Sequence, residues 1–345
     1  MQQKLVSPNL IFIDVTPFCN LKCVHCYSGK LRNVTEIPFF KLKVLIDTFA
    51  KMNVFSVDIV GREPFVRKDI LKIIKYIKSK NIMVNIATNA TLLTEEIVAE
   101  LSTIGVGKIQ VSIDHSDSRI HNTFRRNKCY NKTLAGIKLL TKYNIDVVVC
   151  TTLTNFNFAD LENIIKIIIP LNVKYYRVRM LIPDERSKKY LVTKKQYKSV
   201  VKDIFNLNKK YKEDIIIRQL PHSFLLSKNI PYLTDKDISV PCASCVSRLS
   251  VTYDLKATPC IALSDIYSEN INNNFKLIWK NGKIISQWRS IFKNIKGKCS
   301  ICGYRYFCGG GCRAVVYGVT KDICESDPFC WFDPYKINGD KYENK

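Results

Sequence analysis

The sequence predicts an α/β protein in which a partial barrel of six βα units precedes a small cysteine-rich domain. Short β-rich runs alternate with longer helical patterns from about residue 10 to residue 218, and this rhythm then stops. Nine of the fourteen cysteines lie between Cys242 and Cys330. Repeated βα units are typical of a parallel sheet joined by helical crossovers. With 345 residues, 46% of them hydrophobic, the chain can bury a large core.

Six β-rich runs are the expected strands: residues 10–15, 55–60, 83–87, 108–113, 145–151 and 175–180. The intervening helices are indicated by apolar residues three and four positions apart. The first two such stripes are Leu42, Leu45, Ile46, Phe49 and Met52, and Ile70, Ile73, Ile74 and Ile77. Right-handed crossovers would close these strands into a full or partial barrel, with the chemistry at their C-terminal ends.

The change of pattern also predicts the domain boundaries. We expect the barrel in residues 1–218, a connecting segment with two prolines in 219–240, the cysteine-rich domain in 241–335 and a tail in 336–345. The cysteine spacings look like metal ligation, because a chain of this length does not need disulfides.

Charge and targeting signals limit which classes of partner are expected. No secretory signal and no run of about 18 apolar residues is present, so we expect a cytoplasmic protein without a membrane partner. A formal charge of +24 suggests acidic partners. Basic residues are spread along the whole chain, however, so a solvated basic surface explains the charge equally well, and nucleic acid is not the expected partner.

Three closely spaced cysteines, Cys19, Cys23 and Cys26, follow the first expected strand, with Tyr27 directly after them. Three thiolates bound to a four-iron cluster leave one iron open to chelate a small molecule. The alternative is a zinc site with His25 as fourth ligand, although a histidine between two ligands would point its ring away.

The spacing of three and then two residues, followed by an aromatic residue, resembles the signature of the radical S-adenosylmethionine (SAM) superfamily. The resemblance implies a partial (β/α)6 TIM-like barrel. It also implies a [4Fe-4S] cluster on Cys19, Cys23 and Cys26 that reductively cleaves SAM to a 5′-deoxyadenosyl radical, which abstracts hydrogen from a substrate.

Further segments resemble SAM-binding motifs of this superfamily. Gly61-Arg62-Glu63-Pro64 resembles a Gly-Gly-Glu-Pro stretch that holds the SAM amino group, with Arg62 in place of the second glycine. Thr88-Asn89-Ala90 resembles Thr-Asn-Gly. Ser112 and Arg125 resemble a pair that binds the SAM carboxylate, against the alternatives of a strand-end cap and a solvated charge. The expected SAM-binding residues are Tyr27, Gly61, Glu63, Pro64, Ser112 and Arg125; no catalytic side chain is predicted.

The later cysteines resemble the SPASM extension of radical SAM maturases, which holds two further four-iron clusters. The resemblance implies one cluster on Cys242, Cys245, Cys260 and Cys312, and another on Cys299, Cys302, Cys308 and Cys330. Leu255 stands where that family has a glycine. Two zinc ribbons are the alternative, and whether Cys242 is a ligand, or Cys324 replaces Cys330, is left open.

The resemblance covers nearly the whole chain and implies an enzyme that modifies a ribosomally made peptide or protein. An external electron donor such as a flavodoxin or ferredoxin would supply electrons. Haem or tetrapyrrole biosynthesis is the second hypothesis, because its enzymes have a similarly compact layout. A third hypothesis, from another class, is a non-catalytic iron-sulfur protein with a basic surface for RNA or peptide.

Overall fold

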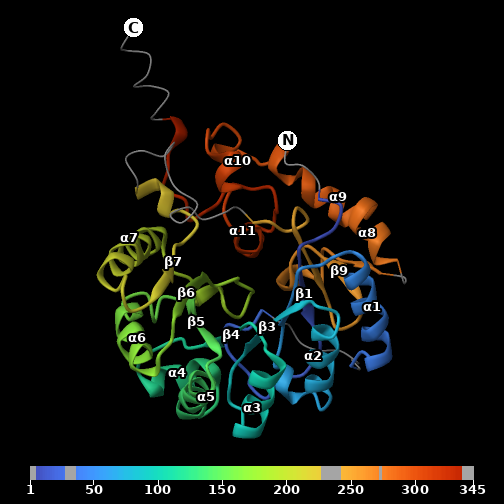
Figure 1. Ribbon diagram of the computed structural model, residues 1–345. Coiled ribbons are helices and arrows are strands. Elements are labelled where there is room, and N and C mark those ends of the chain that lie inside the picture. Colours follow the sequence, from blue (N-terminus) through green and yellow to red (C-terminus); the bar gives the residue numbers. More distant parts are fainter. Residues whose placement is uncertain (1–4, 28–35, 227–241, 272–273, 336–345) are drawn as a thin grey trace.

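One sheet organises the molecule. In the computed structural model, residues 5–27, 36–226, 242–271 and 274–335 are described, and within them ten strands pair in the order β10-β9-β8-β1-β2-β3-β4-β5-β6-β7. In this order the eight strands from β8 to β7 run parallel to one another, whereas β9 pairs antiparallel with both β8 and β10. Because β10 and β7 stand at opposite ends of this order, the barrel is open, as Figure 1 shows.

The strands are β1 Leu10–Asp14, β2 Ser56–Val60, β3 Met83–Thr88, β4 Lys108–Ser112, β5 Asp146–Leu153, β6 Tyr175–Met180, β7 Ile216–Arg218, β8 Arg248–Val251, β9 Lys256–Thr258 and β10 Glu269–Asn270. The six strands expected from the sequence are β1 to β6, each within two residues of its predicted ends. The α/β fold with a partial barrel is therefore confirmed. Strands β7 to β10 were not predicted, because runs of two to four residues carry too little periodicity to recognise.

The helices are α1 Phe39–Lys51, α2 Ile70–Lys78, α3 Glu95–Ile104, α4 Ser118–Arg125, α5 Tyr130–Lys142, α6 Leu161–Ile168, α7 Lys194–Lys210, α8 Phe275–Asn281, α9 Lys283–Ser290, α10 Arg305–Cys308 and α11 Arg313–Thr320. Local signals set their ends. Thr193 and Gln196 form a capping box at the start of α7, and Gly105 ends α3 in the left-handed conformation. None of the described helices combines the length and apolarity that a membrane crossing requires.

Alternation along the strands gives the sheet two different faces. Val57 and Ile59 on β2 are fully buried beneath the outer helices, together with the predicted stripes of α1 and α2. Residues that alternate with the buried ones along each strand, such as Asp58 on β2 and Gln110 on β4, lie on the inner face. Hydrophobic burial on the outer face therefore stabilises the barrel and leaves the inner face free for polar groups.

The C-terminal region continues the barrel sheet. Strand β8 pairs with β1 in parallel register, with Leu10 opposite Arg248. On the outer side the rings of Phe49 in α1 and Phe275 in α8 meet edge to face, with centroids 5.0 Å apart. These contacts couple residues more than 200 positions apart. The division into a barrel and a cysteine-rich domain remains a prediction about how the chain is organised.

If this coupling holds, weakening it should destabilise both regions together. Phe49 is fully buried, so Phe49→Ala should cost about 3–5 kcal/mol and lower the apparent melting temperature by several degrees. The measurement is differential scanning fluorimetry under anaerobic conditions, with Phe40→Ala, at a 63% exposed position of the same helix, as the control. Two separate melting steps, of which Phe49→Ala moves one alone, would contradict the coupling.

Candidate active site

The loop that carries Cys19, Cys23 and Cys26 is held by backbone contacts to neighbouring strand ends. Val24 N donates to the carbonyl of Phe124 in α4 at 2.9 Å, and Glu63 N donates to the carbonyl of Phe18 at 3.2 Å. The segments after β1, β2 and β4 therefore meet at the C-terminal edge of the sheet, where parallel-stranded folds place their sites. The structure brings together the loop, Glu63 and Arg125 as the sequence suggested.

The three thiols form one electrostatic group. Burial raises the pKa of Cys23 to about 11 and raises the pKa of Cys19, and the charge on Cys26 raises both further. Such thiols ionise only beside a strong positive partner, which iron ions supply. Three thiol groups on one loop are the donor type that iron-sulfur clusters require, so the residues present fit such a cluster.

A buried ion pair stands directly behind the cluster loop. Arg125 Nη2 lies 2.6 Å from Asp114 Oδ2, and Arg125 Nη1 lies 3.8 Å from Cys23 Sγ. His25 Nε2 lies 3.4 Å from the same Asp114 oxygen. Burial disfavours the charged carboxylate, yet Arg125 and His25 outweigh it and lower the pKa of Asp114 to about 2. Arg125 is thus a buried, paired cation and not a solvated surface charge.

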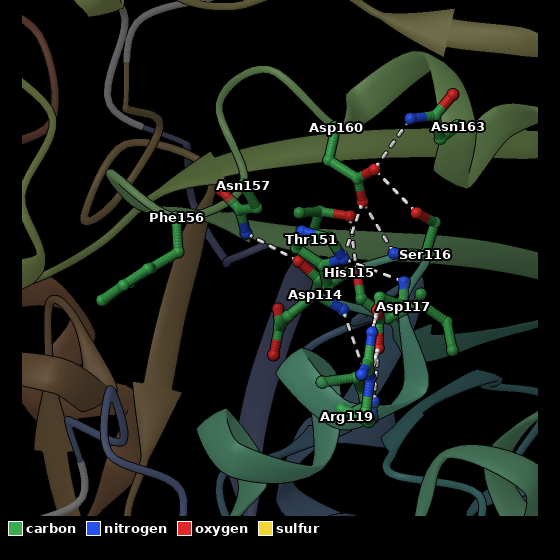
Figure 2. A network of polar contacts seen from close by, with 12 residues as sticks. Asp114, His115, Ser116, Asp117, Arg119, Thr151, Phe156, Asn157, Asp160 and Asn163 are labelled. Atoms are coloured by element: carbon green, nitrogen blue, oxygen red, sulfur yellow. Dashed lines mark hydrogen bonds and ion pairs between the residues drawn. The ribbon is translucent and has the colours of Figure 1, made fainter.

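The segment that presents Asp114 is fixed by residues that follow β5, as Figure 2 shows. Asn157 Nδ2 donates to the Asp114 carbonyl at 2.8 Å. Asp160 accepts hydrogen bonds from both the backbone N and the hydroxyl of Ser116, each at 2.7 Å. These residues were not predicted from the sequence, because their partners lie about 40 positions away.

Glu63 is 1% exposed and binds the protein itself. Its carboxylate accepts from Thr88 Oγ1 and Asn89 N at 2.7 Å each, and from Phe65 N at 3.2 Å. Burial raises its pKa to about 7. In this arrangement the carboxylate joins the end of β2 to the end of β3, while Pro64 begins the 3-10 turn Pro64–Val66.

Gly61 is required by its surroundings. Its φ of +101° is strained for other residues, and an added Cβ would lie 2.3 Å from Asp14 Cγ. Asp14 is 4% exposed, and burial raises its pKa to about 7 against the opposing effect of the Thr16 amide and Arg62. The close approach of these two strand ends places the Gly61 backbone beside the cluster loop.

Two positions where the sequence lacks a family glycine keep the backbone that glycine favours. Ala90 has a φ of +61° and Leu255 a φ of +60°. A left-handed conformation costs a residue with a side chain roughly 1–2 kcal/mol, so the surrounding fold must stabilise it. At both positions the backbone therefore adopts the conformation that glycine takes most easily.

The C-terminal cysteines fall into two electrostatic groups. Cys245 interacts with Cys242 and Cys260, and Cys260 interacts with Cys312. The guanidinium of Arg248 lies 3.5 Å from Cys242 Sγ and helps lower the pKa of that thiol, although burial opposes this. A thiol with a lowered pKa is a good metal ligand.

The second group lines a small cavity, whose lining includes Cys299, Cys302, Cys308 and Cys330. Gly309, Gly310 and Gly311 have φ values of +66°, +68° and +76°, so the backbone curls around it. The described residues include no group of three or more His, Cys, Asp or Glu packed closely enough for a single metal ion. These four thiols border the cavity, and Cys324 is not in its lining.

Comparison with known proteins identifies the class. Residues 13–168 match the family model described as the Radical SAM superfamily. The chain is also 30% identical over 344 residues to the AdoMet-dependent heme synthase of Methanosarcina barkeri, covering 96% of this chain and 98% of the relative. The chain therefore belongs to the radical SAM superfamily and is an enzyme of that class.

A more distant relative and a solved structure each match nearly all of this chain. The mycofactocin maturase MftC of Mycolicibacterium smegmatis is 24% identical, covering 95% of this chain and 84% of the relative. The crystal structure of Streptococcus suis SuiB bound to the precursor peptide SuiA has a TM-score of 0.80 at 17% identity, covering 95% of this chain and 77% of that chain. The latter likeness extends the shared fold into the cysteine-rich region.

The buried Asp14 makes stability depend on pH. Its pKa rises from 3.8 in the unfolded chain to about 7 in the fold, so the unfolded chain releases its proton first. Stability should therefore fall as pH rises from about 4 to about 7. Asp14→Asn removes this dependence. The melting temperature of Asp14→Asn minus that of the wild type should therefore increase between about pH 5 and about pH 8. Thermal melts across this range test it, with the exposed Asp214→Asn as control; parallel curves for wild type and Asp14→Asn would contradict it.

The cavity lining separates Cys330 from Cys324 as cluster ligands. In anaerobically reconstituted protein, Cys330→Ala should lose about four irons per chain, whereas Cys324→Ala should retain the wild-type content. Iron analysis together with the cluster absorbance checks this. Iron loss in Cys324→Ala alone would show that the two cysteines exchange roles.

Proposed function

We propose that this enzyme acts on a haem precursor as an AdoMet-dependent haem synthase. The observation that carries the proposal is the 30% identity to the Methanosarcina barkeri heme synthase, which extends over 96% of this chain and 98% of the relative. Matches to two further AdoMet-dependent heme synthases, at 24% and 25%, support it. The tetrapyrrole hypothesis thus takes precedence over peptide modification, which the sequence placed first.

Peptide or protein modification remains the second candidate. It is favoured by full-length similarity to mycofactocin maturases and to a PqqA peptide cyclase at 22–24% identity. The SPASM-like cysteine pattern does not discriminate, because it is a property of the fold that both groups use.

In the proposed mechanism, Cys19, Cys23 and Cys26 hold a [4Fe-4S] cluster. When bound, this cluster supplies the electron that cleaves SAM to the 5′-deoxyadenosyl radical. The positive charge of Arg125 beside Cys23 favours the thiolate form of that ligand. Gly61, Glu63 and Pro64 shape the SAM-binding segment, with Tyr27 and Ser112 beside it, as proposed from the motif.

The eight remaining proposed ligands would hold two auxiliary clusters, the first on Cys242, Cys245, Cys260 and Cys312 and the second in the cavity with Cys299, Cys302, Cys308 and Cys330. With four protein thiolates each, such clusters have no free iron for substrate, which favours electron transfer. A small external donor such as a flavodoxin or ferredoxin would supply the reducing electrons. The domain boundaries at residues 218 and 241 belong to this proposal.

The decisive measurement uses anaerobically reconstituted protein with SAM and dithionite. We expect about twelve irons per chain and release of 5′-deoxyadenosine. The Cys19→Ala/Cys23→Ala/Cys26→Ala variant should lose about four irons and all release, while Cys150→Ala, which changes a buried cysteine of β5, should match the wild type. A fully loaded protein that never cleaves SAM would favour the non-catalytic binding hypothesis.

Substrate class is tested by offering iron tetrapyrroles with carboxylate side chains and following their masses. SAM-dependent conversion of one of them to haem would support the proposal. No tetrapyrrole conversion, together with SAM-dependent mass change of a peptide substrate, would move the enzyme to the maturases.

A further inference from the structure

The inner face of the barrel carries an unusual group of arginines. Arg177 and Arg179 lie two residues apart on β6, so both point to the same face, and Arg218 on β7 stands opposite Arg177 in the parallel register. Neighbouring strands are about 4.8 Å apart, so the three side chains start within a few ångströms of each other. Their neighbours Tyr176, Val178 and Ile217 are buried against the outer helices, which fixes the arginines on the inner side.

This arrangement is electrostatically unfavourable in the free protein. Burial, and then repulsion by Arg179 and Arg218, lower the pKa of Arg177 to about 10. Burial, Arg179 and Arg248 likewise lower the pKa of Arg218. Like charges placed directly across neighbouring strands destabilise a sheet. A protein that keeps three of them together gains if an anion binds there.

These arginines form no ion pair with a carboxylate among the described residues. Among the described residues, no Asp or Glu lies within 4.0 Å of the guanidinium groups of Arg177, Arg179 or Arg218. Asp58 lies on the same face, and the positive charges of the arginines act on it from a distance. Its carboxylate accepts a hydrogen bond from Asn85 at 2.7 Å. The Nε of Arg177 is buried without a partner, and Arg179 donates to neutral Gln110.

The arginines lie near the C-terminal ends of the strands, where the SAM site is proposed. Arg177 is in register with Cys150, and Cys150 with Ser112, at the C-terminal end of β4. Arg179 lies two residues further toward that end of β6. A molecule held by these guanidinium groups would therefore lie next to the proposed SAM site.

We propose that Arg177, Arg179 and Arg218 form the carboxylate-binding surface for the substrate of this enzyme. The inference rests on the proposed function and deepens it, because it assigns the acidic side chains of a tetrapyrrole to this face of the barrel. Guanidinium groups bind carboxylates through two parallel hydrogen bonds, which fixes orientation as well as charge. The surface would thereby decide which part of the substrate faces the radical.

Binding of a defined tetracarboxylate, coproporphyrin III, to the reconstituted holoenzyme tests this without catalysis. Arg177→Gln, Arg179→Gln and Arg218→Gln should each weaken binding by about tenfold or more, because each removes a charge-assisted contact. Lys138→Gln on the outer helix α5 makes the same charge change at an exposed position and should stay within about twofold of the wild type. Fluorescence titration gives the dissociation constants.

Two further readouts make the result unambiguous. Iron content and cluster absorbance should equal the wild-type values in all three variants, which shows that the fold and the cluster sites are intact. Arg177→Lys keeps the charge but not the paired hydrogen bonds, so it should bind the probe less well than the wild type and better than Arg177→Gln.

The outcomes separate this inference from the proposed function. Arginine-dependent binding of coproporphyrin III supports the surface even if no tetrapyrrole is converted. Wild-type binding by the three variants, or equal weakening by Lys138→Gln, overturns it. Tighter arginine-dependent binding of a hexaglutamate peptide than of the porphyrin would also overturn it, in favour of an acidic peptide substrate.

Discussion

The ion pair between Arg125 and Asp114 is the contact on which the site depends. Both side chains are less than 10% exposed and their closest atoms are 2.6 Å apart. Removing one partner of such a pair leaves a buried charge, which typically costs 3–5 kcal/mol, about the magnitude of a large core truncation. The pair ties α4 to the end of β4, and α4 in turn receives the hydrogen bond from Val24 of the cluster loop. The position of the cysteines is thus set by a contact that contains none of them.

Much of the fold was readable because it obeys strong periodic signals. Buried parallel strands and amphipathic helices produced six strands within two residues of their predicted ends. The short β8 has no such pattern and forms because β1 offers it a free edge. The two groups of later cysteines were implied by the resemblance to the SPASM extension, and spacing alone left zinc ribbons as an alternative. Their roles as ligands remain proposals.

What the sequence did not reveal are interactions between distant polar residues. Arg125 was singled out from a motif, yet its pairing with Asp114, which also contacts His25, depends on tertiary approach. Glu63 was expected to face SAM, whereas its carboxylate is enclosed by three donors from the β2 and β3 ends. Ala90 and Leu255 departed from family glycines, but both retain a positive φ because packing, and not local preference, determines the turn.

Fold alone cannot separate a haem synthase from a peptide maturase, because both kinds of relative match this chain along nearly its whole length. The distinction has to lie in side chains that face the substrate. The outer face of the sheet is mostly apolar and packs against the helices, so it does not face the substrate. The inner face carries arginines on β6 and β7 with few acids near them. The sequence alone does not distinguish these arginines, because it contains 54 Lys and Arg against 30 Asp and Glu. Net charge therefore indicated little about the substrate, while the placement of three arginines on one face is the basis of the anionic substrate proposed above.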